Sequence, residues 1–302
     1  MMRAWSRGLV RYLRRRLGGP AVKLSRAVLW YRGRLEAGVA WIEVRPYQPV
    51  DISLDGLQIQ AEVAVVTSGQ HPVIGIARAA IEHALAASDP KLSRLEARVA
   101  ERQAGNEGRV SRNAYLTAER AKPLTLSEDL QVLSLPIFYR TVLHRLAFAL
   151  KPRVALELGT AHAMSAIYIG AALEDSGTGH LHTIEGDPQR RELARANLEA
   201  ALPGTERVTS HLGLFGDVLP GLLAKLTSPV DLVFDDGPHI PEITLEAFTL
   251  IAPHLAGGAV YVMDDIDHPS GNRRAWDAIR CRADVAAWLE VNGRLGLCVR
   301  TP

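Results

Sequence analysis

Apolar and polar positions alternate with two different periods along the second half of the chain. Between residues 154 and 263, five short apolar runs are separated by longer segments in which apolar residues recur every three or four positions. The runs predict strands and the segments predict helices. The predicted strands are residues 154–158, 180–185, 207–211, 231–235 and 259–263, and the predicted helices are residues 136–150, 163–174, 188–201, 217–226, 241–254 and 272–285. Strands that alternate with helices are typical of an α/β fold with a doubly wound, mostly parallel sheet.

The end of the chain breaks this alternation. Two apolar runs, residues 287–291 and 294–299, are separated only by Asn292-Gly293. Asn-Gly between two such runs is the strongest short-range signal for a β-hairpin. We therefore expect the last strand to run antiparallel to its neighbour on an otherwise parallel sheet.

The chain before residue 136 has a different pattern. Residues 40–70 contain short apolar or alternating runs interrupted by prolines, which predict short strands. Residues 72–121 have a helical pattern, and Gly105 and Gly108 are expected to divide it into two helices. Residues 36–135 are thus predicted to form an accessory or cap region, and residues 72–121 are candidates for a homo-oligomer contact.

The first 35 residues are strongly basic. They hold ten Lys and Arg residues and no acid, while the rest of the chain carries 25 basic and 33 acidic residues, so the net charge of +2 hides an asymmetry. Apolar residues at every fourth position from Trp5 to Leu17 would give a helix one apolar face. A peripheral membrane anchor, an arm for an anionic partner and a solvated tail all remain open.

Composition indicates an ordinary globular protein. Apolar residues make up 47% of the chain and charged residues 23%, and no apolar run approaches the length of a membrane span. Cys281 and Cys298 lack metal-site spacing, which favours reduced thiols in a cytoplasmic protein. The predicted location is therefore cytoplasmic, with a membrane-peripheral position left open by residues 1–35.

The first predicted strand of the sheet leads into a turn with candidate binding chemistry. Its sequence, Glu157-Leu158-Gly159-Thr160, places an acid, one glycine and a small polar residue before a helix, which is where open α/β sheets bind nucleotide-like ligands. One glycine is a poor fit to a pyrophosphate, and Glu157 would repel phosphates. An adenosine-type ligand that carries a positive charge fits better.

This turn, the alternating strands and the terminal hairpin together resemble the class I S-adenosylmethionine-dependent methyltransferases, and most closely the cation-dependent bacterial O-methyltransferases related to catechol and macrolide-sugar enzymes. The resemblance covers residues 136–302 and implies a Rossmann-like sheet that binds S-adenosylmethionine. It implies that Gly159 lies against the amino-acid half of the cofactor, with Thr160 and Ser165 nearby. The family usually has a second glycine near Ala163, which this chain lacks.

Two further segments carry expected cofactor contacts. Glu185 follows the second strand, where a carboxylate can accept hydrogen bonds from both ribose hydroxyls; Asp187, before Pro188, suits a helix N-cap instead. Gly213 follows the third strand, and the resemblance places the next residue beside adenine. That residue is Leu214, so it would act through packing and backbone groups; a place in the hydrophobic core is the alternative.

Acidic residues follow the last two parallel strands. Asp235 and Asp236 end one, and Asp264 and Asp265 end the next. Neighbouring strands bring these carboxylates together, and they would repel one another without a cation. Oxygen ligands suit Mg²⁺, and the resemblance maps the metal ligands onto Asp236, Asp264 and Asp265. Helix capping is the alternative, and Asp235 is expected to point to the opposite face.

His239, three residues after Asp236, is the candidate general base. The sugar-modifying relatives have an aspartate where this chain has Pro238, so the base either moves to His239 or is replaced by the metal. His239 could also start the next helix or ligate the metal. His239 and Asp236 are therefore the predicted catalytic residues.

The sequence thus predicts metal-assisted O-methylation of a small-molecule or glycan hydroxyl, with S-adenosylmethionine as the methyl donor and a divalent cation, Mg²⁺, at the acids after the last two parallel strands. A nicotinamide-dependent oxidoreductase and a cofactor-binding protein without catalysis are the alternatives. Nucleic acid is not an expected partner, because the domain that carries the motifs is net acidic.

Overall fold

The computed structural model describes residues 65–86, 89–104, 130, 134–268 and 271–302. It also describes the backbone of four two-residue strands, which pair antiparallel as β1 (Leu29–Trp30) with β2 (Glu43–Val44) and β4 (Arg109–Val110) with β5 (Leu124–Thr125). The chain divides into two compact units, Met1–Glu62 and Val63–Pro302. The predictions for the basic segment 1–35 and for breaks at Gly105 and Gly108 fall outside the described residues.

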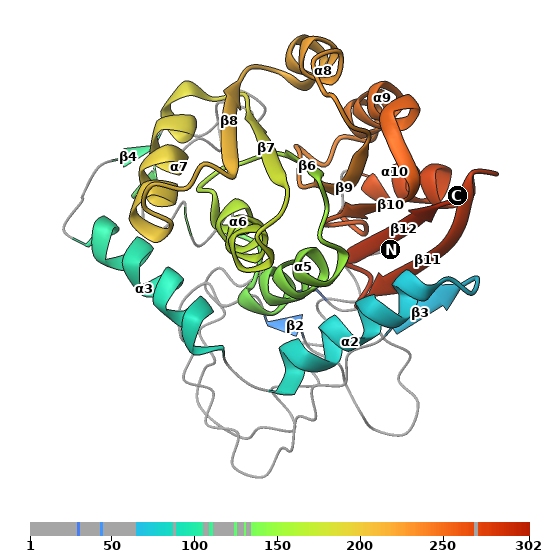
Figure 1. Ribbon diagram of the computed structural model, residues 1–302, viewed down its shortest axis with the longest axis horizontal. Coiled ribbons are helices and arrows are strands. Elements are labelled where there is room, and N and C mark those ends of the chain that lie inside the picture. The colour runs from blue at the N-terminus through green and yellow to red at the C-terminus, as the bar shows by residue number, and fades with distance from the viewer. Residues whose placement is uncertain are drawn as a thin grey trace. The chain divides into compact units, whose positions relative to one another are not determined.

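An eight-stranded sheet forms the centre of the second unit (Figure 1). Its strand order is β3-β11-β12-β10-β9-β6-β7-β8, and the five strands from β10 to β8 are parallel, which confirms the predicted fold class. The strands are β3 (Val65–Ser68), β6 (Val154–Leu158), β7 (His180–Glu185), β8 (Val208–Leu212), β9 (Val230–Asp235), β10 (Leu255–Met263), β11 (Val285–Val291) and β12 (Leu295–Arg300).

The terminal hairpin forms as predicted. Strand β12 runs antiparallel to both β10 and β11. The two turn residues, Asn292 and Gly293, have positive φ angles of 54° and 62°, as a tight two-residue hairpin turn requires. Strand β3, which the sequence did not place in this sheet, pairs antiparallel with β11 and forms the edge.

Helices cover both faces of the sheet. They are α5 (Ile137–Leu150), α6 (Met164–Ser176), α7 (Pro188–Ala201), α8 (Phe215–Leu223), α9 (Pro241–Ile251), extended by the 3₁₀ turn η2 (Ala252–His254), and α10 (Asn272–Arg280). Asp187 caps α7, because its Oδ1 accepts from the Arg190 N–H at 3.0 Å. Helix α10 ends earlier than predicted, since the residues from Val285 onward pair with β12 as a strand.

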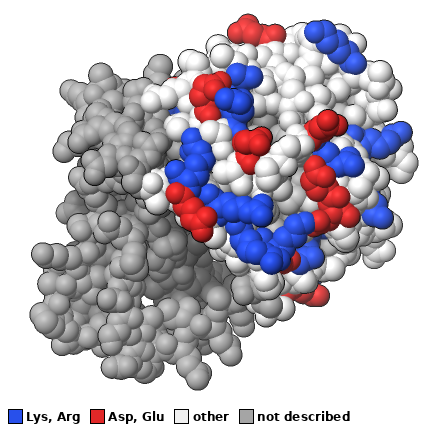
Figure 2. All heavy atoms as spheres, turned by 60° about the vertical axis from the view of Figure 1, so that its left-hand side comes forward, with Lys and Arg blue, Asp and Glu red and all other residues white. Residues whose placement is uncertain are grey.

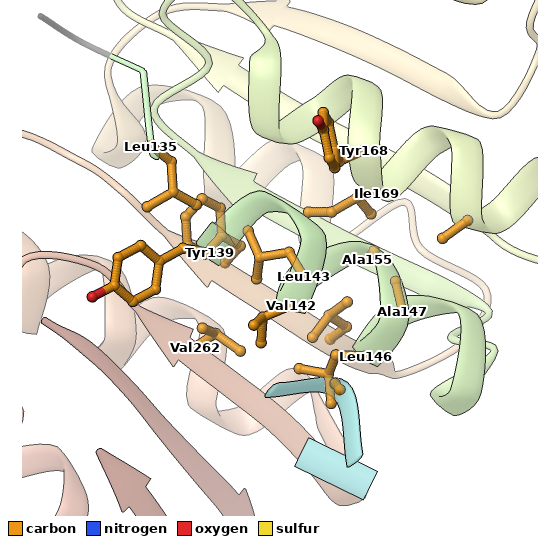
Figure 3. Packing of buried hydrophobic residues seen from close by; sticks show 14 of the residues in the cluster. Leu135, Tyr139, Val142, Leu143, Leu146, Ala147, Ala155, Tyr168, Ile169 and Val262 are labelled. Carbon is orange, nitrogen blue, oxygen red and sulfur yellow. The ribbon is translucent and has the colours of Figure 1, made fainter. Parts of the chain in front are cut away.

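Two hydrophobic clusters hold these layers together. One lies under α5, α6 and α7, and the other lies under α8, α9 and α10. Figure 3 shows Val142, Leu143 and Leu146 of α5 pointing toward the sheet, where Ala155 and Val262 lie. Because both faces are covered, β6 is buried along its whole length, as expected for a central parallel strand.

The helices that precede residue 136 belong to this same unit. Helix α2 (Pro72–Ala86) packs on α5, and α3 (Pro90–Gln103) packs on α7. Asp89 is the N-cap of α3, because its side chain accepts from the Lys91 N–H at 2.8 Å and Pro90 occupies the first helical turn.

Paired charges fasten α3 to its neighbours. Glu96 of α3 pairs with Arg140 of α5 at 2.8 Å and accepts from the Tyr168 hydroxyl of α6 at 2.7 Å. Figure 2 shows basic and acidic side chains lying next to one another on the face it presents. Elsewhere in this unit, Cys281 and Cys298 are both free thiols. Among the described residues, no helix is both long and apolar enough to cross a bilayer.

Candidate active site

The turn after β6 joins the ends of three strands. Gly159 has a φ of 91°, and its N–H donates to the Ile184 carbonyl of β7 at 3.0 Å. A Cβ at this position would lie 2.2 Å from the Asp236 carbonyl oxygen. Asp236 in turn donates its N–H to the Leu158 carbonyl at 2.9 Å. The glycine is therefore required both by its backbone conformation and by the close approach of the loop after β9.

The structure shows how the turn forms without the second glycine that the family pattern usually has. Ala161 and Ala163 both adopt the left-handed conformation, with φ of 45° and 63°, and Ala163 is the N-cap of α6. This conformation is costly for residues with a Cβ. The turn thus keeps a glycine-like backbone while using alanine.

Glu157 is fully buried beneath the turn. It accepts a hydrogen bond from the Thr183 hydroxyl, which is also bonded to the Thr160 hydroxyl. Burial raises the pKa of Glu157 to about 7; hydrogen bonds from Ser165 and Thr183 oppose this rise, and the Glu185 carboxylate adds to it. Thr160 and Ser165, both predicted cofactor residues, therefore lie around the predicted acid.

Glu185 is held at the end of β7 by two backbone donors. Its Oε2 accepts from the Ala161 N–H at 2.8 Å, and its Oε1 accepts from the Asp187 N–H at 2.9 Å. Each oxygen keeps a second lone pair, because a carboxylate has about four acceptor sites. The side chain is thus oriented between the first and second strand ends, where two ribose hydroxyls could be bound.

Gly213 and Leu214 lie beside Glu185. The Gly213 N–H donates to the Glu185 carbonyl at 2.9 Å, and Gly213 has a φ of 146°. Leu214 is 52% exposed, so the alternative that it belongs to the hydrophobic core is wrong, whereas Phe215 packs against the cluster under α8. An exposed leucine next to the proposed ribose position is available to cover a flat ring.

The acids after β9 and β10 come together as expected, but with an unexpected partner. Arg294, in the terminal hairpin, binds both oxygens of Asp264, at 2.8 and 2.6 Å, and its Nη2 lies 3.5 Å from Asp265 Oδ1. Burial raises the pKa of Asp236 well above its usual value, and the Asp264 and Asp265 carboxylates raise it further. Burial also raises the pKa of Asp264, and Arg294 opposes that rise.

Asp235 faces away from this group. Its Oδ2 accepts from the Tyr261 hydroxyl at 2.6 Å, and its Oδ1 accepts from the Gly237 N–H at 3.3 Å. Burial raises the pKa of Asp235, although both hydrogen bonds oppose the rise. Asp235 therefore anchors the loop that carries Asp236 and His239 to strand β10.

His239 lies between two carboxylates. Its Nε2 is 3.7 Å from Asp236 Oδ1 and 3.6 Å from Asp265 Oδ2, and its ring centroid is 5.0 Å from that of His268. Its φ of 56° is in the left-handed region, a strained conformation of the kind that clusters at functional sites. The imidazole can therefore exchange a proton while two carboxylates orient it.

The structure thus brings the predicted cofactor residues to one group of strand ends, and His239 and the acids to the adjacent group. Sequence reasoning missed Arg294, Thr183 and Tyr261. Arg294 left one signal, an arginine directly after the Asn292-Gly293 turn and before the apolar run of β12. Beside the acids, Asp267 pairs with Arg273, and Asn272 donates to the Asp264 and Asp265 carbonyls.

A divalent cation does not fit the acids in this arrangement, because the guanidinium occupies both oxygens of Asp264. Within residues 134–268 and 271–302, no group of three or more His, Cys, Asp or Glu side chains is arranged to hold a metal ion. The cation therefore stays a prediction from the sequence.

Comparison with known proteins relates the sheet region to methyltransferases. Residues 156–266 match the family model described as a methyltransferase domain. The chain is 38% identical over 64 residues to demethylmacrocin O-methyltransferase of Streptomyces fradiae, covering 20% of this chain and 16% of that protein. It is 34% identical over 127 residues to catechol O-methyltransferase of Mycobacterium tuberculosis, covering 42% and 54%. The chain thus spans about half, or less, of the length of these relatives.

Solved structures share the fold. The O-methyltransferase TomG of Streptomyces achromogenes, in complex with S-adenosylmethionine, superimposes with a TM-score of 0.50 at 24% identity over 77% of this chain and 100% of its own. An O-methyltransferase of Bacillus cereus gives 0.51 at 17% identity, over 76% and 100%. Residues 156–266 are thus similar to a methyltransferase domain, and the chain shares its fold with solved O-methyltransferases.

Proposed function

We propose that this protein transfers the methyl group of S-adenosylmethionine to a hydroxyl of a small molecule or glycan. The observation that carries the proposal is the adjacency of two groups at the same sheet edge. One is a carboxylate suited to ribose at the end of β7, and the other is a histidine held between two carboxylates after β9. Strand β6 lies between them: the Asp236 N–H donates to the Leu158 carbonyl at 2.9 Å, and the Gly159 N–H donates to the Ile184 carbonyl of β7 at 3.0 Å.

The cofactor side of the proposal assigns a task to each predicted residue. Glu185 binds the ribose hydroxyls, Leu214 covers the adenine, and Gly159 allows the methionine part to approach the backbone. Thr160 and Ser165, with Thr183, hold Glu157 below the turn. When bound, S-adenosylmethionine supplies an electrophilic methyl group on a sulfonium.

The acceptor side rests on His239. The imidazole takes the proton of the acceptor hydroxyl as the oxygen attacks the methyl group, and Asp236 and Asp265 orient the ring. General-base catalysis of this kind contributes about 10²–10⁴-fold. Water exclusion and in-line positioning supply the remainder.

Cation-assisted transfer, with Asp236, Asp264 and Asp265 as ligands, is the alternative version of this proposal. It would require Arg294 to leave Asp264. The names of the two relatives suggest the first acceptors to try, a catechol and demethylmacrocin. Peripheral membrane contact through residues 1–35, a homo-oligomer contact through residues 72–121 and a cytoplasmic location also stay predictions.

Methyl transfer from labelled S-adenosylmethionine to these acceptors, and to a panel of sugars and phenols, tests the proposal. His239→Asn should lower turnover at least about 100-fold, the lower end of a general base's contribution, with unchanged affinity for S-adenosylhomocysteine. His83→Asn is the matched control, because His83 is exposed on α2, away from the site. Full turnover by the His239 variant would contradict the assignment.

A further inference from the structure

Arg294 is the one guanidinium found within the acid cluster in the part of the chain that the structure describes. Its side chain is 7% exposed, and that of Asp264 is 1% exposed. The pair is bidentate, with Nε 2.8 Å from Oδ1 and Nη2 2.6 Å from Oδ2. This is the strongest geometry for an arginine and a carboxylate, and it uses the two oxygens that a metal ion would need.

The hairpin holds Arg294 in place independently of the acids. Its N–H donates to the Val291 carbonyl at 2.9 Å, and its carbonyl accepts from the Ile266 N–H at 2.9 Å. The guanidinium lies over the Tyr139 ring, 5.3 Å from the ring centroid. The hydroxyl of Tyr139 accepts from Asn292 in the hairpin turn at 3.1 Å. Backbone bonds and an aromatic ring therefore position the cation before any ligand arrives.

The positive charge of Arg294 lies directly beside the carboxylates of the acid cluster. Arg294 offsets Asp264 directly and lies 3.5 Å from Asp265. Burial alone would lower the pKa of Arg294, but Asp264 and Asp265 raise it, so the guanidinium stays charged. One positive charge thus faces the two carboxylates at the position that a divalent ion would occupy.

We propose that Arg294 is the resident cation of the acid cluster and occupies the place of a divalent metal ion. The guanidinium fixes Asp264 and Asp265, and Asp265 in turn faces His239 at 3.6 Å. Arg294 is therefore a positioning residue for the base. Its Nη1 has no hydrogen-bond partner among the described residues, so one donor remains for a ligand oxygen. The proposal concerns ion binding at the same site as the proposed function, and it is tested without turnover.

Titration of the full chain with Mn²⁺, followed by the electron paramagnetic resonance signal of free Mn²⁺, tests this proposal. The wild-type chain and Arg294→Lys should show no saturable site. Arg294→Met, which removes the charge but keeps an unbranched apolar stem, should gain one saturable Mn²⁺ site. Asp264→Asn in the Arg294→Met background should remove the gained site.

A wild-type chain that binds one Mn²⁺, with the site lost in Asp264→Asn, would overturn the proposal. Equal lack of binding by the wild type and a folded Arg294→Met variant would also overturn it, because Arg294 would then not be what excludes the ion. Should Arg294→Met fail to fold, the wild-type and Asp264→Asn titrations still decide the outcome. Methyl transfer can fail while these results hold, so the two proposals are distinguishable.

Discussion

The turn after β6, with Glu185 beside it, lies next to the acid cluster of Asp236, Asp264 and Asp265. We call the first region the cofactor turn. The two regions stabilise buried carboxylates in opposite ways. At the cofactor turn, the hydrogen bonds that Glu157 and Glu185 accept from the described residues come from hydroxyl and backbone N–H groups. At the acid cluster, a guanidinium binds Asp264 and lies close to Asp265. Neutral donors leave a carboxylate able to bind a cationic or hydroxyl-bearing ligand, whereas a guanidinium fixes it.

This difference separates two tasks. The turn keeps acceptor capacity for a ligand, since hydrogen bonds from neutral donors do not cancel the charge. The cluster instead uses its charge internally, to orient His239. Gly159 and Asp236 connect the two regions, so a change there should damage both.

Gly159→Ala is expected to have the largest effect, because it breaks the connection. The new Cβ would lie 2.2 Å from the Asp236 carbonyl oxygen at a φ of 91°, so the backbone must move. We expect a loss of more than about 4 kcal/mol in the free energy of unfolding, the range of exceptional substitutions. Gly177→Ala is the matched control, because it has a φ of 68° and nothing within 4 Å of the new Cβ. It should cost about 1–2 kcal/mol, and equal losses measured by urea denaturation would contradict the close-packing argument.

Glu157→Gln tests the cofactor turn through the pH dependence of the free energy of unfolding. The pKa of Glu157 rises from 4.5 to about 7 on folding, so the folded chain binds an extra proton between these values. Wild-type stability should therefore fall relative to the variant as the pH rises from about 4.5 to about 7, by about 3 kcal/mol in total. Denaturation of the cofactor-free chain at several pH values measures this. Glu192→Gln, at an exposed position, should track the wild type, and a flat difference for Glu157→Gln would contradict the raised pKa.

Tyr261→Phe tests how the loop between the two regions is anchored. Loss of the hydroxyl leaves a buried Asp235 oxygen without its donor, which costs about 1–3 kcal/mol. Turnover should also fall, because Asp235 holds the Gly237 N–H next to Asp236. Tyr168→Phe removes a hydroxyl donor from Glu96 of α3 rather than from Asp235 and should leave turnover unchanged. Unaltered turnover in both variants would show that the anchor does not position the loop.

Leu214→Ala should have the smallest effect on folding. Leu214 is 52% exposed, so stability should change by less than about 0.5 kcal/mol. Affinity for S-adenosylhomocysteine, measured by calorimetry, should fall by about 1 kcal/mol, because apolar cover of the adenine is lost. Leu212→Ala, at a position that is 47% exposed on β8, should leave this affinity unchanged. Equal losses of affinity in the two variants would show that Leu214 does not cover the adenine.

Local patterns predicted most of the fold. The alternation of strands and helices and the Asn292-Gly293 hairpin follow from short-range sequence, since each pattern fixes its own backbone. Strand β3 could not be placed, because an edge strand that pairs only with β11 leaves no periodic mark of its partner. The start of α3 carries a local signal, since Asp89 is an N-cap directly before Pro90.

The two regions of the site also differ in how well the sequence predicts them. Glu157, Gly159 and Glu185 are found from sequence because the strand–turn–helix pattern places them. Arg294 is not, because its partner Asp264 lies 30 residues away and only the antiparallel pairing of β12 with β10 brings the two together. The charge balance of a buried cluster depends on tertiary contacts. The acidic residues after β9 and β10 therefore do not reveal the arginine that pairs with them.

Thermal unfolding of the full chain with S-adenosylhomocysteine or NADH tests the central claim most directly. The account predicts a higher Tm with S-adenosylhomocysteine and no change with NADH. The shift should disappear in Glu185→Ala and persist in Glu192→Ala. Stabilisation by NADH, or a shift with S-adenosylhomocysteine that survives the loss of Glu185, would contradict the assigned cofactor site.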